Sequence, residues 1–199
     1  MPTSRMEAFS DGVIAILITI MVLELRTPRG TTWGALHDTL PRLLVYVLSF
    51  VFLGIYWNNH HHMLMATEQV RGLALWANLH LLFWLSLVPF TTSWMGENHF
   101  ATAPVAAYGI VLLASALAYY GLQTSIIRGQ GANSTLAIAV GRDFKGKASP
   151  LLYAGAIGLA YLHRWIAIGI YVLVALIWLV PDRRVERTMA ATASAEQLT

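Results

Sequence analysis

One acidic residue lies in a part of the chain where a charge is costly. Asp11 falls inside an apolar segment, about residues 4 to 25, that is long enough to cross a bilayer as a helix. An ionised side chain in hydrocarbon costs a few kcal/mol even on lenient insertion scales, so it is expected to serve a function and to have a partner. Asp11 could hold its helix in place by pairing, or it could carry protons. The alternative is that it lies among the lipid headgroups and is hydrated.

Two groups of residues offer such a partner. Arg5 is the nearest cation, but a separation of six residues puts it on a different face of the helix, so a link must pass through another helix or a second subunit. His60 and His61 belong to a run of three histidines that ends at His62. Successive helical side chains diverge by about 100°, and the i, i+4 pair of zinc proteases is absent, so no metal site is expected. Either His60 or His61 could instead turn toward the first helix and hydrogen-bond to it.

Farther along the same segment, four side chains share one helix face. The positions i, i+3, i+4 and i+7 are occupied by Ile16, Thr19, Ile20 and Leu23. Thr19 would place one polar layer among apolar ones, as in a pore that closes by excluding water. The alternative is a packed core or a lipid-facing ridge, because a helix that is apolar all round does not reveal its faces.

The composition indicates which class of protein must position these residues. Of the 199 residues, 57% are hydrophobic and 12% are charged, and the mean hydropathy is +0.59, as in integral membrane proteins. The net charge of +3 is concentrated at segment ends and does not suggest nucleic-acid binding. The sequence has no cysteine, catalytic triad, phosphate-binding loop or zinc signature, so neither an enzyme nor a cofactor is expected.

Hydropathy predicts an all-α fold with six membrane-crossing helices. We place four long spans at residues 4–25, 41–65, 72–95 and 104–127, and two short helices at residues 151–161 and 165–180. Pro89 is expected to kink the third span. One re-entrant hairpin is the alternative for the last two helices. Residues 1–187 would form one membrane domain, and residues 188–199 a disordered tail.

The distribution of positive charge predicts the topology. Six crossings put both termini on one side, and cytoplasmic termini leave nine of the thirteen Lys and Arg residues inside, as the positive-inside rule favours. The inner residues are Arg5, Arg71, Arg128, Arg142, Lys145, Lys147, Arg183, Arg184 and Arg187, and the outer ones are Arg26, Arg29, Arg42 and Arg164.

Three motifs resemble one family of ion channels. They are Arg-x-x-x-Phe-Ser-Asp-Gly-Val-x-Ala-Ile-x-x-Thr at residues 5–19, Tyr-Trp-x-x-His-His at residues 56–61, and Asn-Leu-x-Leu-Leu-Phe-x-x-Ser-Leu-x-Pro-Phe at residues 78–90. These motifs are similar to the lysosomal potassium channel called transmembrane protein 175 and its bacterial homologues, over about the first half of the chain. The sequence departs from that family at Ile14, where Phe is usual, and at Ile20 and Met21, where a Leu-Leu pair is usual.

The resemblance implies a bacterial, single-repeat channel in the cell membrane that passes potassium without a cofactor. It implies a homotetramer of six-helix units in the lipid bilayer, with the first helices around a central pore. In that arrangement Ile16 forms the narrow ring, and Ile20 and Leu23 form further apolar layers. Thr19 supplies a hydroxyl ring that favours potassium over sodium.

The resemblance also implies a supporting polar network. Arg5, Ser10 and Asp11 match the positions that join the first helix, through a histidine of the second, into this network, and the histidine is either His60 or His61. Two other functions remain open at this point. One is a proton-coupled carrier in which Asp11 and a second-helix histidine relay protons, and the other is a membrane scaffold without transport.

Overall fold

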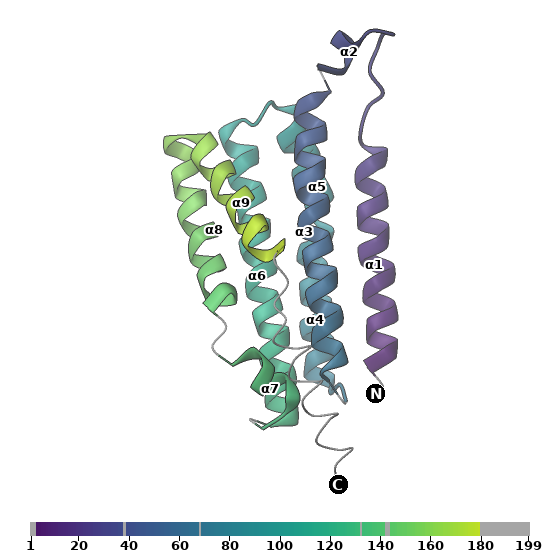
Figure 1. Ribbon diagram of the computed structural model, residues 1–199, viewed down its shortest axis with the longest axis vertical. Helices are drawn as coiled ribbons and strands as arrows, with labels where there is room; N and C mark the ends of the chain where they lie inside the picture. Colours follow the sequence, from purple (N-terminus) through teal and green to yellow (C-terminus); the bar gives the residue numbers. More distant parts are fainter. Residues whose placement is uncertain (1–2, 38, 68, 132, 142–143, 180–199) are drawn as a thin grey trace.

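The computed structural model describes residues 3–37, 39–67, 69–131, 133–141 and 144–179, which form helices and connecting segments with no strand. The helices are α1 (Thr3–Leu23), α2 (Trp33–His37), α3 (Leu40–Met65), α4 (Gly72–Ser86), α5 (Val88–Glu97), α6 (Thr102–Gln130), α7 (Thr135–Val140), α8 (Phe144–Leu162) and α9 (Arg164–Leu179). The long helices run side by side, with α1 at one edge of the bundle and α8 at the opposite edge (Figure 1). The predicted all-α class is confirmed for this part of the chain.

Four segments are long and apolar enough to cross a membrane. They are Thr3–Leu23, Leu40–Met65, Gly72–Glu97 and Thr102–Gln130. Their bounds agree with the four predicted long spans to within a few residues at each end. The remaining two predicted helices correspond to α8 and to the shorter, apolar α9.

α8 begins earlier than hydropathy predicts. Its first turn carries Lys145 and Lys147, so an apolar window misses it although the backbone is already helical from Phe144. The Ser149 hydroxyl donates to the carbonyl oxygen of Lys145 at 2.8 Å, just before Pro150. The predicted tail at residues 188–199, and the cations Arg142, Arg183, Arg184 and Arg187, lie outside the described residues.

Pro89 interrupts the third span where the sequence predicts a kink. α4 ends at Ser86 and α5 begins at Val88, so Pro89 lies in the first turn of α5, where a missing N–H is tolerated. The Thr91 hydroxyl donates toward the carbonyl oxygens of Leu87 (3.1 Å) and Val88 (3.2 Å). This hydroxyl therefore provides a hydrogen-bond donor to carbonyl oxygens at the junction between α4 and α5.

The core divides into two apolar clusters. The first lies mainly between α1, α3, α4 and α6 and includes Ile14, Leu81 and Leu122. The second lies between α3, α5, α6, α8 and α9 and includes Tyr108 and Tyr171. Helices α3 and α6 contribute to both clusters, whereas the described residues of α1 contribute only to the first. One face of α1 therefore attaches it to the bundle.

Candidate functional site

The packed face of α1 fixes how this helix is rotated. Its buried residues are Met6, Ser10, Ile14, Leu17 and Met21. They are three or four positions apart, as one side of a helix requires. This face contacts α3, α4 and α5. The packing therefore defines a rotation that the uniformly apolar sequence does not reveal.

The opposite face of α1 carries the stripe that the sequence singles out. Ile16 is 57% exposed, Ile20 41% and Leu23 82%, and Thr19 is exposed as well. The Thr19 hydroxyl donates to the carbonyl oxygen of Ile16 at 2.9 Å, so its lone pairs remain available on the outer side of the helix. The structure thus brings all four residues together on a face of α1 that turns away from the other described helices.

A buried hydrogen-bonded chain joins α1, α3 and α4 on the packed side. Asn78 Nδ2 donates to Ser10 Oγ at 2.9 Å, and Ser10 Oγ donates to the carbonyl oxygen of Met6 at 2.8 Å. The amide oxygen of Asn78 therefore faces His60 and accepts from its Nε2 at 2.8 Å, which places the ring proton on Nε2. Ser10, His60 and Asn78 are at most 2% exposed. Of the two histidines, His60 is the one that the structure links to Ser10.

The bridging residue Asn78 is the member of this chain that sequence reasoning misses. From sequence, Asn78 is one of several polar side chains that could hydrogen-bond between helices. The available signal in the sequence is an amide in the mostly apolar α4, which also contains His80 and Ser86. That signal gains its meaning only when the rotations of α1 and α3 are known.

Two acidic residues of α1 bind α3 beside the buried chain. Glu7 Oε1 lies 2.7 Å from His61 Nδ1, and Trp57 Nε1 donates to Asp11 Oδ1 at 3.0 Å. The two acids are one turn apart on α1. Trp57 and His61 are one turn apart on α3, where their rings stack. These four residues, named here the α1–α3 clamp, hold the two helices at two successive levels.

Half of the α1–α3 clamp lies outside the set of predicted site residues. Asp11 and His61 are predicted site residues, whereas Glu7 and Trp57 are not. The only sign of this contact in the sequence is a pair of i, i+4 spacings, from Glu7 to Asp11 and from Trp57 to His61. Such spacings identify a contact only after two helices are known to lie side by side.

Arg5 lies apart from the buried chain and from the α1–α3 clamp. Its side chain is exposed, and no ion pair to Arg5 occurs within the described ranges. A partner for Arg5 on another helix or in a second subunit stays a prediction. In the same part of the chain, no three His, Cys, Asp or Glu residues lie close enough together to hold a metal ion.

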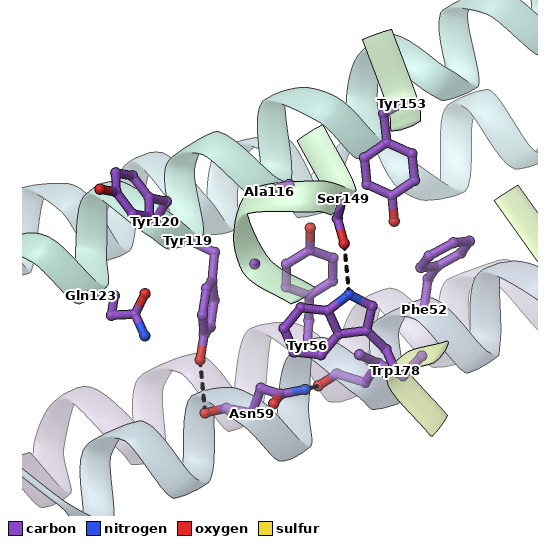
Figure 2. Close-up of a pocket in the computed structure, with 12 residues that line it drawn as sticks. Phe52, Tyr56, Asn59, Ala116, Tyr119, Tyr120, Gln123, Ser149, Tyr153 and Trp178 are labelled. Carbon is purple, nitrogen blue, oxygen red and sulfur yellow. Dashed lines mark hydrogen bonds between the residues drawn. The ribbon is translucent and has the colours of Figure 1, made fainter. Parts of the chain in front are cut away.

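A separate cavity of about 50 Å³ lies between α3, α6, α8 and α9 (Figure 2). Tyr119 donates to the carbonyl oxygen of Asn59 at 3.1 Å, and Trp178 Nε1 donates to Ser149 Oγ at 2.9 Å. Half of the twelve lining residues are aromatic, namely Phe52, Tyr56, Tyr119, Tyr120, Tyr153 and Trp178. None of the predicted site residues lines this cavity, so it is distinct from the exposed face of α1.

Comparison with known proteins connects this geometry to one family. The family model described as "Endosomal/lysosomal potassium channel TMEM175" matches residues 5–89. A potassium channel from Chryseobacterium sp. (strain P1-3) is 54% identical over 189 residues, which cover 95% of this chain and 98% of that protein. The chain belongs to the TMEM175 family. It is a multi-pass membrane protein, and TMEM175 proteins are ion channels rather than enzymes.

Other TMEM175 relatives extend the comparison. The crystal structure of a lysosomal potassium-selective channel TMEM175 homologue from Chamaesiphon minutus has a TM-score of 0.77 at 26% identity, covering 90% of this chain and 97% of that one. The human protein named "Endosomal/lysosomal proton channel TMEM175" is 35% identical over 92 residues, which are 40% of this chain and 18% of that protein. The names of the relatives therefore include both potassium and protons.

The TMEM175 match falls on the half of the chain that holds the candidate site. Residues 5–89 include most of α1, all of α3 and α4, and the start of α5. They therefore include the exposed stripe, the buried hydrogen-bonded chain and the α1–α3 clamp. The aromatic cavity also uses α6, α8 and α9, which lie beyond the matched residues.

Proposed function

We propose that this protein is a potassium channel of the plasma membrane, in which four copies surround a central pore lined by the exposed face of α1. The carrying observation is that Ile16, Thr19, Ile20 and Leu23 form a largely apolar face that no described part of the chain covers, on a helix at the edge of the bundle (Figure 1). Rotational symmetry would let each copy contribute the same face to a shared axis. The potassium-channel relative that matches 95% of this chain supports potassium as the ion.

The proposed channel unit would cross the membrane six times. Four long spans would be followed by α8 and α9 as the fifth and sixth crossings, and the positive-inside rule favours cytoplasmic termini. Residues 1–187 then form one channel domain. Its partners are the lipid bilayer, further copies of the same chain and the permeating potassium ions, and it uses neither a cofactor nor nucleic acid.

The proposed gate is a stack of apolar rings. Ile16, Ile20 and Leu23 from four copies would exclude water from a narrow pore, and a dry constriction resists the passage of a hydrated ion. Between them, the exposed Thr19 side chains would face the axis. Their oxygen atoms would keep free lone pairs, because each hydroxyl proton is donated to the carbonyl oxygen of Ile16. These oxygen atoms would help a partly dehydrated ion to cross.

The polar residues on the packed side would act as positioning residues. The buried chain of Ser10, Asn78 and His60 joins α1 to α3 and α4. The α1–α3 clamp adds two further contacts between α1 and α3. These contacts determine which face of α1 is turned outward. In this proposal Asp11 positions α1 by accepting the Trp57 indole N–H at Oδ1 and does not bind the permeating ion.

The channel proposal predicts that Ile16→Asn makes the pore leak. Four amide side chains would wet the narrow ring, and lowering a barrier by about 1.4 kcal/mol raises a rate about tenfold, so we expect at least that increase in potassium flux. The measurement compares potassium and sodium flux into liposomes that contain purified wild-type or variant protein. Wild-type flux is expected to favour potassium.

Ile110→Asn is a matched control for this experiment. Ile110 is 50% exposed on α6, away from α1, so its replacement should leave the flux unchanged. The absence of flux in both wild type and Ile16→Asn, with the tetramer intact, would overturn the channel proposal. Unchanged flux in Ile16→Asn beside a conducting wild type would remove Ile16 from the gate.

The competing proposal is a proton-coupled carrier that relays protons between Asp11 and a second-helix histidine. In the structure these groups have separate partners, since Asp11 accepts from Trp57 and His60 bonds to Asn78. Asp11→Asn discriminates between the two proposals. A channel should assemble less well but still pass potassium where assembled, because the asparagine oxygen still accepts from Trp57. A carrier should lose proton coupling completely in a liposome pH assay.

A further inference from the structure

The exposed face of α1 continues inward beyond the four residues considered so far. Phe9 is 54% exposed, and Gly12 is exposed as well. Alternating spacings of four and three residues connect Arg5, Phe9, Gly12, Ile16, Thr19 and Leu23. This is the repeat that keeps one seam of a helix turned toward a common axis in a bundle of helices. The stripe therefore extends over nearly the whole length of α1.

The residues along this stripe alternate in character. Phe9, Ile16 and Leu23 are bulky and apolar and occupy one position of the repeat. Arg5, Gly12 and Thr19 are polar or small and occupy the other. At 1.5 Å per residue, successive layers would be about 5 Å apart along the axis. In four copies, each apolar ring would thus be followed by a wider or more polar layer.

Close packing against the described residues of the chain does not explain Gly12. A Cβ atom added at Gly12 would meet nothing within 4 Å. Glycine also weakens a helix interior relative to alanine, so its presence in the middle of α1 needs another reason. Since the open space lies on the exposed face, that reason is to be sought between copies of the chain rather than within one copy.

We infer that Phe9 forms an inner apolar ring of the pore and that Gly12 forms a wide layer between the Phe9 and Ile16 rings. The missing side chains at Gly12 leave a chamber in which a hydrated potassium ion can wait before it passes the Ile16 ring. This inference rests on the proposed channel function and extends it, because it assigns two further pore-lining residues. It also places the Arg5 side chains at the inner mouth.

The natural absence of cysteine allows a direct test. Phe9→Cys, Gly12→Cys and Ile16→Cys each introduce a single thiol position, which a charged methanethiosulfonate reagent can modify. We expect modification of Phe9→Cys and of Gly12→Cys to reduce potassium flux into liposomes at least tenfold. Gly155→Cys on α8 is the matched control, because a Cβ there also meets nothing within 4 Å, and its modification should leave the flux unchanged.

Comparing Ile16→Cys with the other two cysteine variants separates this inference from the channel proposal. If wild type does not conduct, or if modified Ile16→Cys is not blocked, the proposed pore is wrong. If modified Ile16→Cys is blocked while Phe9→Cys and Gly12→Cys conduct normally after confirmed modification, only the present inference is overturned.

A size series at Gly12 provides a second measurement. Gly12→Ala should conduct with a reduced flux, and Gly12→Leu should reduce the flux at least tenfold because four leucine side chains would fill the chamber. Size-exclusion chromatography checks that the assembly is intact, and Gly158→Leu, also in open space on α8, is the control. Wild-type flux through an intact Gly12→Leu assembly would overturn the wide layer, and the cysteine variants decide the matter if Gly12→Leu does not assemble.

Discussion

Adding one methyl group at Gly109 is expected to lower the thermal unfolding midpoint of the protein by about 10 °C. The Cβ atom of an alanine at this position would lie 2.8 Å from Tyr171 Cζ, 2.9 Å from Ile157 Cγ1 and closer still to the Tyr171 hydroxyl. Tyr171 is fully buried, and its hydroxyl donates to the carbonyl oxygen of Val105 at 3.2 Å. Overpacking and the loss of this hydrogen bond together amount to about 3 kcal/mol.

The measurement for Gly109→Ala is thermal unfolding of the detergent-solubilised protein, followed by tryptophan fluorescence. Gly155→Ala and Gly158→Ala are matched controls on α8, because a Cβ at either position meets nothing within 4 Å. Alanine is the better helix former, so these midpoints should stay the same or rise. Adding Tyr171→Phe should restore part of the loss by removing the closest atom. An unchanged midpoint for Gly109→Ala would contradict the packing of α6 against α8 and α9.

Asn78→Leu is expected to destabilise the protein more than the double replacement Asn78→Leu with His60→Leu. In the single variant, the buried Nε2–H of His60 loses its acceptor and Ser10 loses its donor. The double variant has no imidazole N–H that is buried without an acceptor. Replacing both hydrogen-bonding partners by apolar groups costs much less stability than leaving one buried partner without its hydrogen bond. Hydrogen bonds inside membrane bundles couple by about 0.6 kcal/mol on average and up to about 1.7 kcal/mol. We expect about 1.5 kcal/mol here, because both residues are at most 2% exposed.

A double-mutant cycle on unfolding free energies measures this coupling. Purely additive effects of Asn78→Leu and His60→Leu would contradict the hydrogen bond between them. Because the buried chain positions α1, Asn78→Leu should also lower potassium flux in liposomes. Asn98→Leu is a suitable control, since Asn98 is exposed and its amide bonds only locally, to the carbonyl oxygen of Trp94.

Hydropathy predicts the long spans of this fold well because a bilayer sets their length independently of their neighbours. The kink at Pro89 is likewise local, since proline removes a hydrogen-bond donor wherever it stands. The start of α8 is different. Its first turn carries Lys145 and Lys147, and a method that follows apolar content cannot detect a helical turn with that composition.

The candidate site is predictable from sequence only in part. Ile16, Thr19, Ile20 and Leu23 can be placed on one face from the sequence, because helical geometry alone determines which side chains are aligned. Whether that face is buried depends on the rotation of α1, and an apolar helix does not encode its rotation in its hydropathy pattern.

The histidine of the buried chain illustrates the same limit. His60 and His61 are adjacent and chemically identical, so only the rotation of α3 assigns His60 to Asn78 and His61 to Glu7. The contacts made by Asn78 and Trp57 join distant parts of the chain, and a single sequence carries no direct sign of such pairs.

The uncovered face of α1 has a consequence for cells that make this protein. In the proposed channel, a newly inserted single copy would expose residues such as Ile16 and Leu23 but would enclose no path, because the proposed pore wall needs several copies. The number of complete pores would then follow mass action and rise steeply with the density of protomers in the membrane. At low expression the membrane would remain impermeable to the ion even though every copy is folded. The level of synthesis would therefore set the membrane's permeability, in addition to any stimulus that opens an assembled pore.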